Sequence, residues 1–195
     1  MNRILLFFCL LFGLYSCHTP STTKTPSDNT VSEFRITSTQ VGAIRKGMTI
    51  KELYAALPED RIKKLRTRTE LSNETADYYY IYGDSSRLLL IVNSERQNDE
   101  SSRISRIIVK DKRFQTASGI GLASTVGAIR TAYPHSQFLP SVDEIILYVP
   151  EIDANFEINK RLLPPSLAID STGEIAPDSI PVQTKVTDLS IFWDY

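Results

Sequence analysis

The sequence has few of the residues that build most catalytic and metal sites. Its 195 residues include two cysteines, Cys9 and Cys17, and two histidines, His18 and His135. Because no cysteine follows Cys17, the rest of the chain has no disulfide and depends on its core for stability. With one histidine beyond the N-terminal region and no cysteine, a transition-metal site is not expected. We therefore expect neither a metal nor another cofactor.

The sequence also lacks the common catalytic motifs. It contains no G-x-S-x-G, no G-x-x-x-x-G-K-[ST] and no complete G-x-G-x-x-G. Gly119 and Gly121 form only a G-x-G, which we interpret as permissive backbone before a helix. His135 follows that helix with no nucleophile in its sequence context, so we expect it to face solvent or cap a loop. These absences predict that the protein is not an enzyme.

An excess of either charge is missing as well. The chain has 22 Lys and Arg against 23 Asp and Glu, which gives a formal net charge of −1. A nucleic-acid-binding domain normally has a marked basic excess, because it must neutralise phosphates. We therefore predict no nucleic-acid partner.

No apolar run is long enough to span a membrane. Residues 4–14 are apolar, but this run is well short of the roughly 20 residues that a spanning helix needs. Arg3 precedes it, and the pattern predicts a signal peptide over residues 1–16. Residues 14–17, Leu-Tyr-Ser-Cys, resemble the lipobox of bacterial lipoproteins. The resemblance implies that Cys17 is acylated and anchors the mature chain in a membrane; the alternative is a plain secreted protein cleaved nearby.

The segment after Cys17 is polar. Residues 17–33 are rich in Thr, Ser and Pro and have almost no apolar side chains, which predicts a flexible, lipid-anchored tether. No aspartate and no acidic cluster directly follow Cys17. In lipoproteins this implies sorting to the outer membrane, and we expect the protein on its periplasmic face.

Residues 41–58 give the clearest structural signal. Thr49 and Glu52 have the T-x-x-E spacing of a capping box, in which each side chain binds a free backbone N–H at a helix start. Met48 and Leu53 have the spacing of a hydrophobic staple. Apolar residues then follow the helical period, and Pro58 stops the pattern. The spacing predicts a helix over residues 49–57.

This pattern recurs 76 residues later. Thr49 corresponds to Thr125 and Leu53 to Ile129, which predicts a second helix and an internal repeat. Antiparallel strands grouped after each helix predict an α+β fold of two tandem helix-plus-sheet units, over residues 34–113 and 114–195. The strands are expected over residues 34–37, 61–70, 77–82, 87–93, 103–110, 144–149, 154–159 and 185–193. Residues 40–47 fit a short helix or a short strand.

The helix motif resembles a known family. Gly47, Met48, Thr49, Leu53, Leu57 and Pro58 are similar to the motif of the SmpA/OmlA (BamE) lipoproteins of the outer-membrane barrel-assembly machinery. The tandem arrangement resembles the β-lactamase-inhibitor-protein fold. The resemblance implies a non-enzymatic assembly or inhibitor module with an envelope protein as partner. The alternative is a periplasmic hydrolase or small-ligand carrier, which would need a deep pocket with converging polar groups.

A tyrosine-rich hairpin is the candidate binding face. If residues 83–86 form its turn, Tyr82 lies opposite Arg87, Tyr80 opposite Leu89 and Tyr78 opposite Ile91. Alternation then places Tyr78, Tyr80 and Tyr82 on one face with Arg87. Tyr and Arg are enriched in protein interfaces, so we predict that these four residues bind a protein. The alternative is that the second unit packs on this face.

Two further segments have a possible surface role. The basic residues 61–70 form either a patch for an acidic partner or an edge strand that charge protects against unwanted pairing. Asp170-Ser171-Thr172 and Asp178-Ser179-Ile180 resemble the acceptor sequence of periplasmic O-glycosylation. Ser171 and Ser179 are therefore predicted glycosylation sites.

Overall fold

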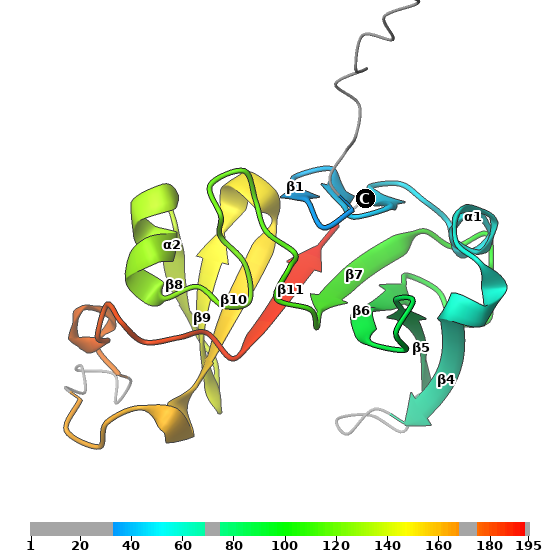
Figure 1. The fold of residues 1–195 in the computed structure, drawn as a ribbon. Helices are drawn as coiled ribbons and strands as arrows, with labels where there is room; N and C mark the ends of the chain where they lie inside the picture. The colour runs from blue at the N-terminus through cyan, green and yellow to red at the C-terminus, as the bar shows by residue number, and fades with distance from the viewer. Residues whose placement is uncertain (1–32, 69–74, 168–174, 194–195) are drawn as a thin grey trace, which may run out of the picture. The chain divides into compact units, whose positions relative to one another are not determined.

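The computed structural model describes residues 33–68, 75–167 and 175–193. Its largest element is an eight-stranded antiparallel sheet with the strand order β4-β5-β6-β7-β11-β10-β9-β8 (Figure 1). The strands are β4 (Ile62–Arg68), β5 (Thr75–Tyr82), β6 (Leu88–Ser94), β7 (Ile104–Val109), β8 (Gln137–Pro140), β9 (Glu144–Val149), β10 (Ala154–Asn159) and β11 (Asp188–Phe192). A second sheet contains β1 (Ile36–Thr37), β2 (Gln40–Val41) and β3 (Ile44–Arg45). The ambiguous residues 40–47 thus contribute two short strands.

The helices are short. The α-helices are α1 (Ile50–Ala56) and α2 (Val126–Ala132), and the 3₁₀ helices are η1 (Glu59–Arg61), η2 (Pro150–Ile152), η3 (Lys160–Leu162) and η4 (Pro177–Ser179). None of them, within the described ranges, is long and apolar enough to cross a membrane.

The predicted capping box is confirmed at α1. The hydroxyl of Thr49 accepts a hydrogen bond from the backbone N–H of Glu52 at 3.2 Å, and the Glu52 carboxylate accepts one from the backbone N–H of Thr49 at 2.8 Å. At α2, Thr125 accepts from the N–H of Ala128 at 3.3 Å, and alanine has no side chain to return the bond. Both helices therefore begin at the expected threonine, with one reciprocal cap and one single cap.

The predicted fold class is wrong. The sequence predicted an α+β protein of two helix-plus-sheet units, whereas the structure is mostly β, with two seven-residue α-helices. The expected closing strands β7 and β11 pair with each other, so that Val109 lies opposite Leu189 and Ile107 opposite Ile191. All four side chains are fully buried. Pairing removes two free sheet edges and makes the apolar side continuous, which is the physical reason for one sheet instead of two.

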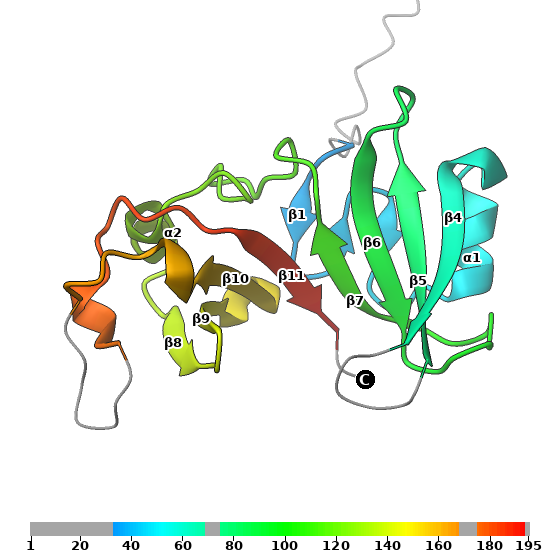
Figure 2. The same ribbon diagram turned by 90° about the horizontal axis from the view of Figure 1, so that it is seen from below.

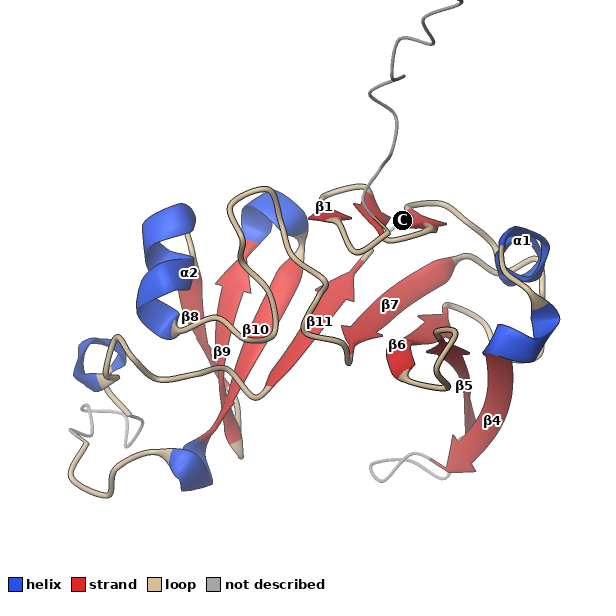
Figure 3. Ribbon diagram, in the orientation of Figure 1, coloured by secondary structure: helices blue, strands red, loops and turns tan. Residues whose placement is uncertain are grey.

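One side of the large sheet is covered. Seen from below in Figure 2, β6 and β7 lie in front of the three-stranded sheet, and Figure 3 shows α1 above the upper end of β4. Leu53 of α1 and Ile129 of α2 are both completely buried. Tyr54 of α1 packs edge-to-face on Tyr79 of β5, with ring centroids 6.2 Å apart. The buried side chains of both halves form one continuous hydrophobic cluster.

The basic run forms an edge strand. β4 pairs with β5 and ends the sheet, which confirms the edge-strand prediction for this segment. Two of its cations point to the fully buried Asp77, whose carboxylate lies 2.9 Å from both Lys64 Nζ and Arg66 Nε. Burial alone would raise the pKa of Asp77, but hydrogen bonds from Lys64, Arg66 and the backbone N–H of Asn98 hold that pKa below its usual value.

Candidate protein-binding site

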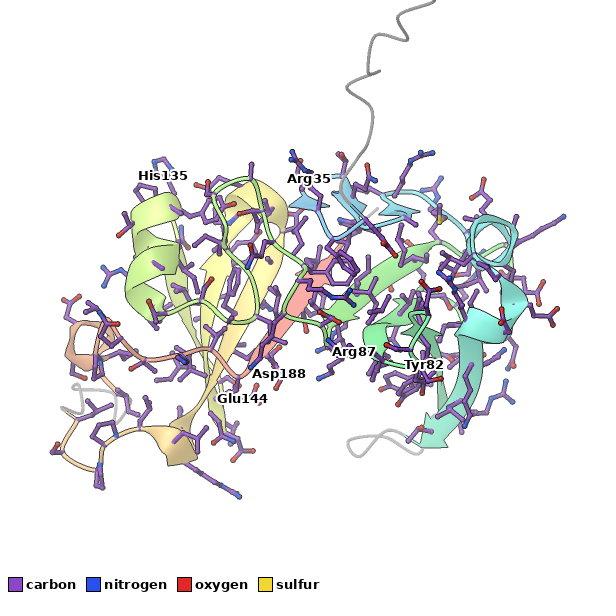
Figure 4. The ribbon with its side chains drawn as sticks, in the orientation of Figure 1. Arg35, Tyr82, Arg87, His135, Glu144 and Asp188 are labelled. Atoms are coloured by element: carbon purple, nitrogen blue, oxygen red, sulfur yellow. The ribbon has the colours of Figure 1, made fainter. Side chains whose placement is uncertain are left out.

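Strand β5 divides its tyrosines between the two sides of the sheet. Tyr79 is 1% exposed beneath α1, whereas Tyr78, Tyr80 and Tyr82 are half-buried. Because side chains alternate along a strand, these three lie on the side away from α1. In Figure 4 Tyr82 lies on the lower side of the sheet, and Arg35 lies on the upper side. The alternation predicted for the tyrosines is therefore confirmed.

The predicted hairpin register is wrong. Tyr80 lies opposite Ile91 and Tyr82 opposite Leu88, and the register shifts between Ile81 and Tyr82. The turn is closed by a 2.9 Å hydrogen bond from the N–H of Gly83 to the carbonyl of Arg87. Arg87 therefore belongs to the turn and is not paired with Tyr82 across the strands. The irregularity adds a residue to β6, which strand alternation alone does not reveal.

The tyrosines belong to a wider apolar surface on this side of the sheet. Leu65 of β4, which is 38% exposed, lies opposite Tyr78. Ile91 of β6 lies between Tyr80 and Ile108 of β7. We call this surface the tyrosine patch, and its members are Leu65, Tyr78, Tyr80, Tyr82, Ile91 and Ile108.

The same side of the sheet continues over the second half with different chemistry. Ile108 lies opposite Ser190 of β11. Two residues before Ser190 on the same strand, Asp188 lies opposite Glu157 of β10. Figure 4 shows Asp188 and Glu144 on the same lower side as Tyr82. The sequence alone does not assign these residues to this surface, because they join the tyrosines only through the pairing of β7 with β11.

Arg106 of β7 lies between the apolar and the acidic part of this surface. Its Nη2 donates to the hydroxyl of Ser190 at 3.1 Å and lies 3.9 Å from the Glu157 carboxylate, and its guanidinium lies 5.0 Å from the ring centroid of Phe192. Burial raises the pKa of Glu157, and the nearby Glu144 carboxylate raises it further, while Arg106 lowers it. The surface therefore has a partly desolvated polar centre next to the tyrosine patch.

The other predicted site residues lie elsewhere. Cys17 and Ser171 are outside the described residues. Ser179 lies in η4, is half-buried, and donates its hydroxyl hydrogen to the carbonyl of Ala176 at 2.7 Å. The side chain of His135 is 84% exposed, with Nδ1 3.2 Å from the carboxylate of Glu151. In the part of the chain that the structure describes, no three His, Cys, Asp or Glu side chains are grouped to hold a metal ion.

Comparison with known proteins gives a fold but no function. No protein-family model matches the sequence, and no curated protein matches it. The structure is similar to the crystal structure of the uncharacterized protein yfeY from Escherichia coli, with a TM-score of 0.54. The two chains are 13% identical, and the match covers 81% of this chain and 99% of that one. At this identity the similarity shows the fold alone, and the resemblance to SmpA/OmlA lipoproteins stays a prediction.

Proposed function

We propose that this is a lipid-anchored protein of the cell envelope that binds another envelope protein through the uncovered side of its large sheet. The observation behind the proposal is the tyrosine patch, in which three tyrosines lie half-buried on the side of the sheet opposite α1. In this proposal the protein has no enzymatic activity, and Cys17 anchors it to the periplasmic face of the outer membrane.

The chemistry of the surface supports protein binding. Tyrosine offers a large, rigid apolar area together with a hydroxyl that is hydrated when the surface is free. Interfaces of this type have an apolar centre and a polar rim. Here Ile91 and Ile108 extend the apolar centre, while Arg106 borders it. An apolar patch on the uncovered side of an otherwise well-packed sheet is typical of a surface that another protein covers.

The test is a double substitution, Tyr80→Ala with Tyr82→Ala, in the full-length chain. Intact cells expressing the tagged protein are crosslinked, and the partners recovered by affinity purification are compared with those of the wild type. We expect the variant to fold with a nearly unchanged melting temperature and to lose its main partner, because both side chains lie away from the buried core. In the same cells, Cys17→Ser should leave the membrane fraction or remain uncleaved.

Tyr133→Ala is the control, since Tyr133 is a half-buried tyrosine at the end of α2 and outside the patch. Because Tyr133 packs against the core, this variant should lose stability and still retain the partner. A loss of several kcal/mol in the Tyr80/Tyr82 variant, as for core aromatics, would show that these tyrosines serve packing instead. A Cys17→Ser variant that fractionates and migrates as the wild type does would exclude the lipid anchor.

A further inference from the structure

Four cationic side chains surround a hollow of about 620 Å³ next to the β5–β6 turn. Its lining comes from that turn and from the segment that follows β7. The lining residues are Arg87, Lys110, Asp111, Lys112, Arg113 and Gln115. The lining thus has four positive charges and one negative charge, in a chain whose formal net charge is −1.

Asp111 fixes the geometry of this cluster. Its side chain is 3% exposed, and its carboxylate accepts hydrogen bonds from Nε and Nη2 of Arg113 at 3.0 and 2.8 Å. Arg87 Nη1 lies 3.9 Å from the same carboxylate. The guanidinium of Arg113 also lies 3.9 Å from the ring centroid of Phe34. These contacts hold Arg113 in place as a fixed part of the wall of the hollow.

The remaining cations differ in how far their charge is already compensated. Lys110 Nζ donates to the carboxylate of Asp188 at 2.6 Å, and the charge of Glu33 also acts on Arg113. Arg87 is 64% exposed and has only the 3.9 Å ion pair with Asp111. Lys112 and the side-chain amide of Gln115 make no hydrogen bond to the described residues. The hollow therefore offers uncompensated charge and free donors mainly at Arg87, Lys112 and Gln115.

We propose that this hollow binds a phosphate group, either free or in a lipid headgroup, through Arg87, Lys112 and Gln115 around the Arg113–Asp111 pair. A phosphate offers several acceptor oxygens and can carry two charges, which suits a guanidinium fork together with an ammonium group. A single carboxylate would compensate only one of the two charges at Arg87 and Lys112. The site lies beside the tyrosine patch and does not depend on it.

The experiment uses the purified full-length chain in neutral detergent, titrated by calorimetry at constant ionic strength set with sodium chloride. The probes are inorganic phosphate, glycerol 3-phosphate and a soluble short-chain phosphatidylglycerol. We expect saturable binding of at least one probe, weakened tenfold or more by Arg87→Gln with Lys112→Gln. The control, Arg45→Gln with Lys185→Gln, removes the same charge from exposed positions away from the hollow and should bind within twofold of wild type.

Binding of the lipid probe alone assigns the site to a headgroup, and binding of inorganic phosphate assigns it to a free anion; each supports the proposal. Absence of saturable binding, or an equal loss in the control variant, overturns it. Tighter binding of a polyglutamate peptide than of every phosphate probe also overturns it, in favour of an acidic protein. If the double variant does not fold, Lys112→Gln alone provides the same comparison, because Lys112 is exposed.

Discussion

The two halves of the large sheet are alike on the covered side and different on the uncovered side. Under α1, Ile50 and Leu53 are buried, and under α2 the corresponding residues Val126 and Ile129 are buried in the same way. On the uncovered side, the first half has the tyrosine patch, whereas the second half combines the apolar Leu139, Ile146 and Tyr148 with acidic residues around Glu157. The repeat is therefore closest where packing requires it and weaker where side chains face outward, which is the side that we propose for binding.

The junction between the halves follows from the same repeat. In the sequence, Ile107 of β7 corresponds to Leu189 of β11, and Val109 corresponds to Ile191. In the structure the pairs are crossed, with Ile107 opposite Ile191 and Val109 opposite Leu189. Crossed pairing of this kind is what a local two-fold relation between equivalent strands produces. Each half thus presents the same apolar strand to the other, which explains why the sheet continues across the junction.

The largest expected effect tests whether the two halves unfold together. Leu53→Ala and Ile129→Ala each empty a fully buried position beneath a helix and should cost about 2–5 kcal/mol. Because both side chains belong to one hydrophobic cluster, each variant should lower a single transition. Urea unfolding followed by circular dichroism and by Trp193 fluorescence makes the measurement. Two separate transitions, each sensitive to one substitution, would show that the halves are independent domains.

Local signals predicted the helices, and the long-range pairing could not be predicted. Thr49 and Glu52 determine the start of α1 through contacts three residues apart, so the sequence is sufficient there. The pairing of Val109 with Leu189 joins residues far apart in the chain, and no local pattern encodes it. The alternation of side chains along a strand correctly predicted that Tyr79 lies on the other side of the sheet from Tyr78 and Tyr80.

The candidate site was predictable only in part, because it also depends on strand register and strand order. The register beyond Ile81 depends on an irregularity in β6, so the predicted partner of Tyr82 was wrong. Glu157 could be assigned to the same surface as the tyrosines only after the order of all eight strands was known. The prediction of two separate units failed for the same reason as the assignment of Glu157, since both depended on β7 and β11 pairing with each other.

The second prediction compares the fully buried Asp77 of the first half with the partly buried Glu157 of the second half. Asp77→Asn should destabilise the protein by about 1.5–3 kcal/mol at pH 7, because it weakens hydrogen bonds from Lys64 and Arg66 to a charged group. Glu157→Gln should stabilise the protein slightly at pH 7, because it removes a carboxylate whose charged form is disfavoured by burial and by Glu144. Urea unfolding as a function of pH measures both effects.

The two effects should depend on pH in opposite ways. The pKa of Asp77 is lowered by folding, so its contribution is present above its unfolded pKa of about 4 and disappears only as the pH falls further. The pKa of Glu157 is raised, so its neutral form stabilises the protein fully below an unfolded pKa of about 4. That contribution is lost as the pH rises through the folded pKa. The gain from Glu157→Gln should therefore shrink between neutral pH and pH 4, while the loss from Asp77→Asn persists. A constant difference for both variants would contradict this assignment.

The smallest expected effect compares the two helix caps. Thr49→Ala removes the hydroxyl that accepts a hydrogen bond from the Glu52 N–H and that also donates to the Glu52 carboxylate. The substitution should lower the free energy of unfolding by about 0.5–2 kcal/mol. Thr125→Ala should cost less, because the Thr125 hydroxyl makes one 3.3 Å contact, with the N–H of Ala128, whereas the Thr49 hydroxyl makes two contacts. Thr39→Ala, at an exposed threonine between β1 and β2, controls for the loss of a threonine side chain as such and should be nearly neutral. Urea midpoints of the three variants, measured at one pH, give the order directly. Equal losses at Thr49 and Thr125 would mean that the extra contact between the Thr49 hydroxyl and the Glu52 carboxylate adds nothing to the stability of the cap.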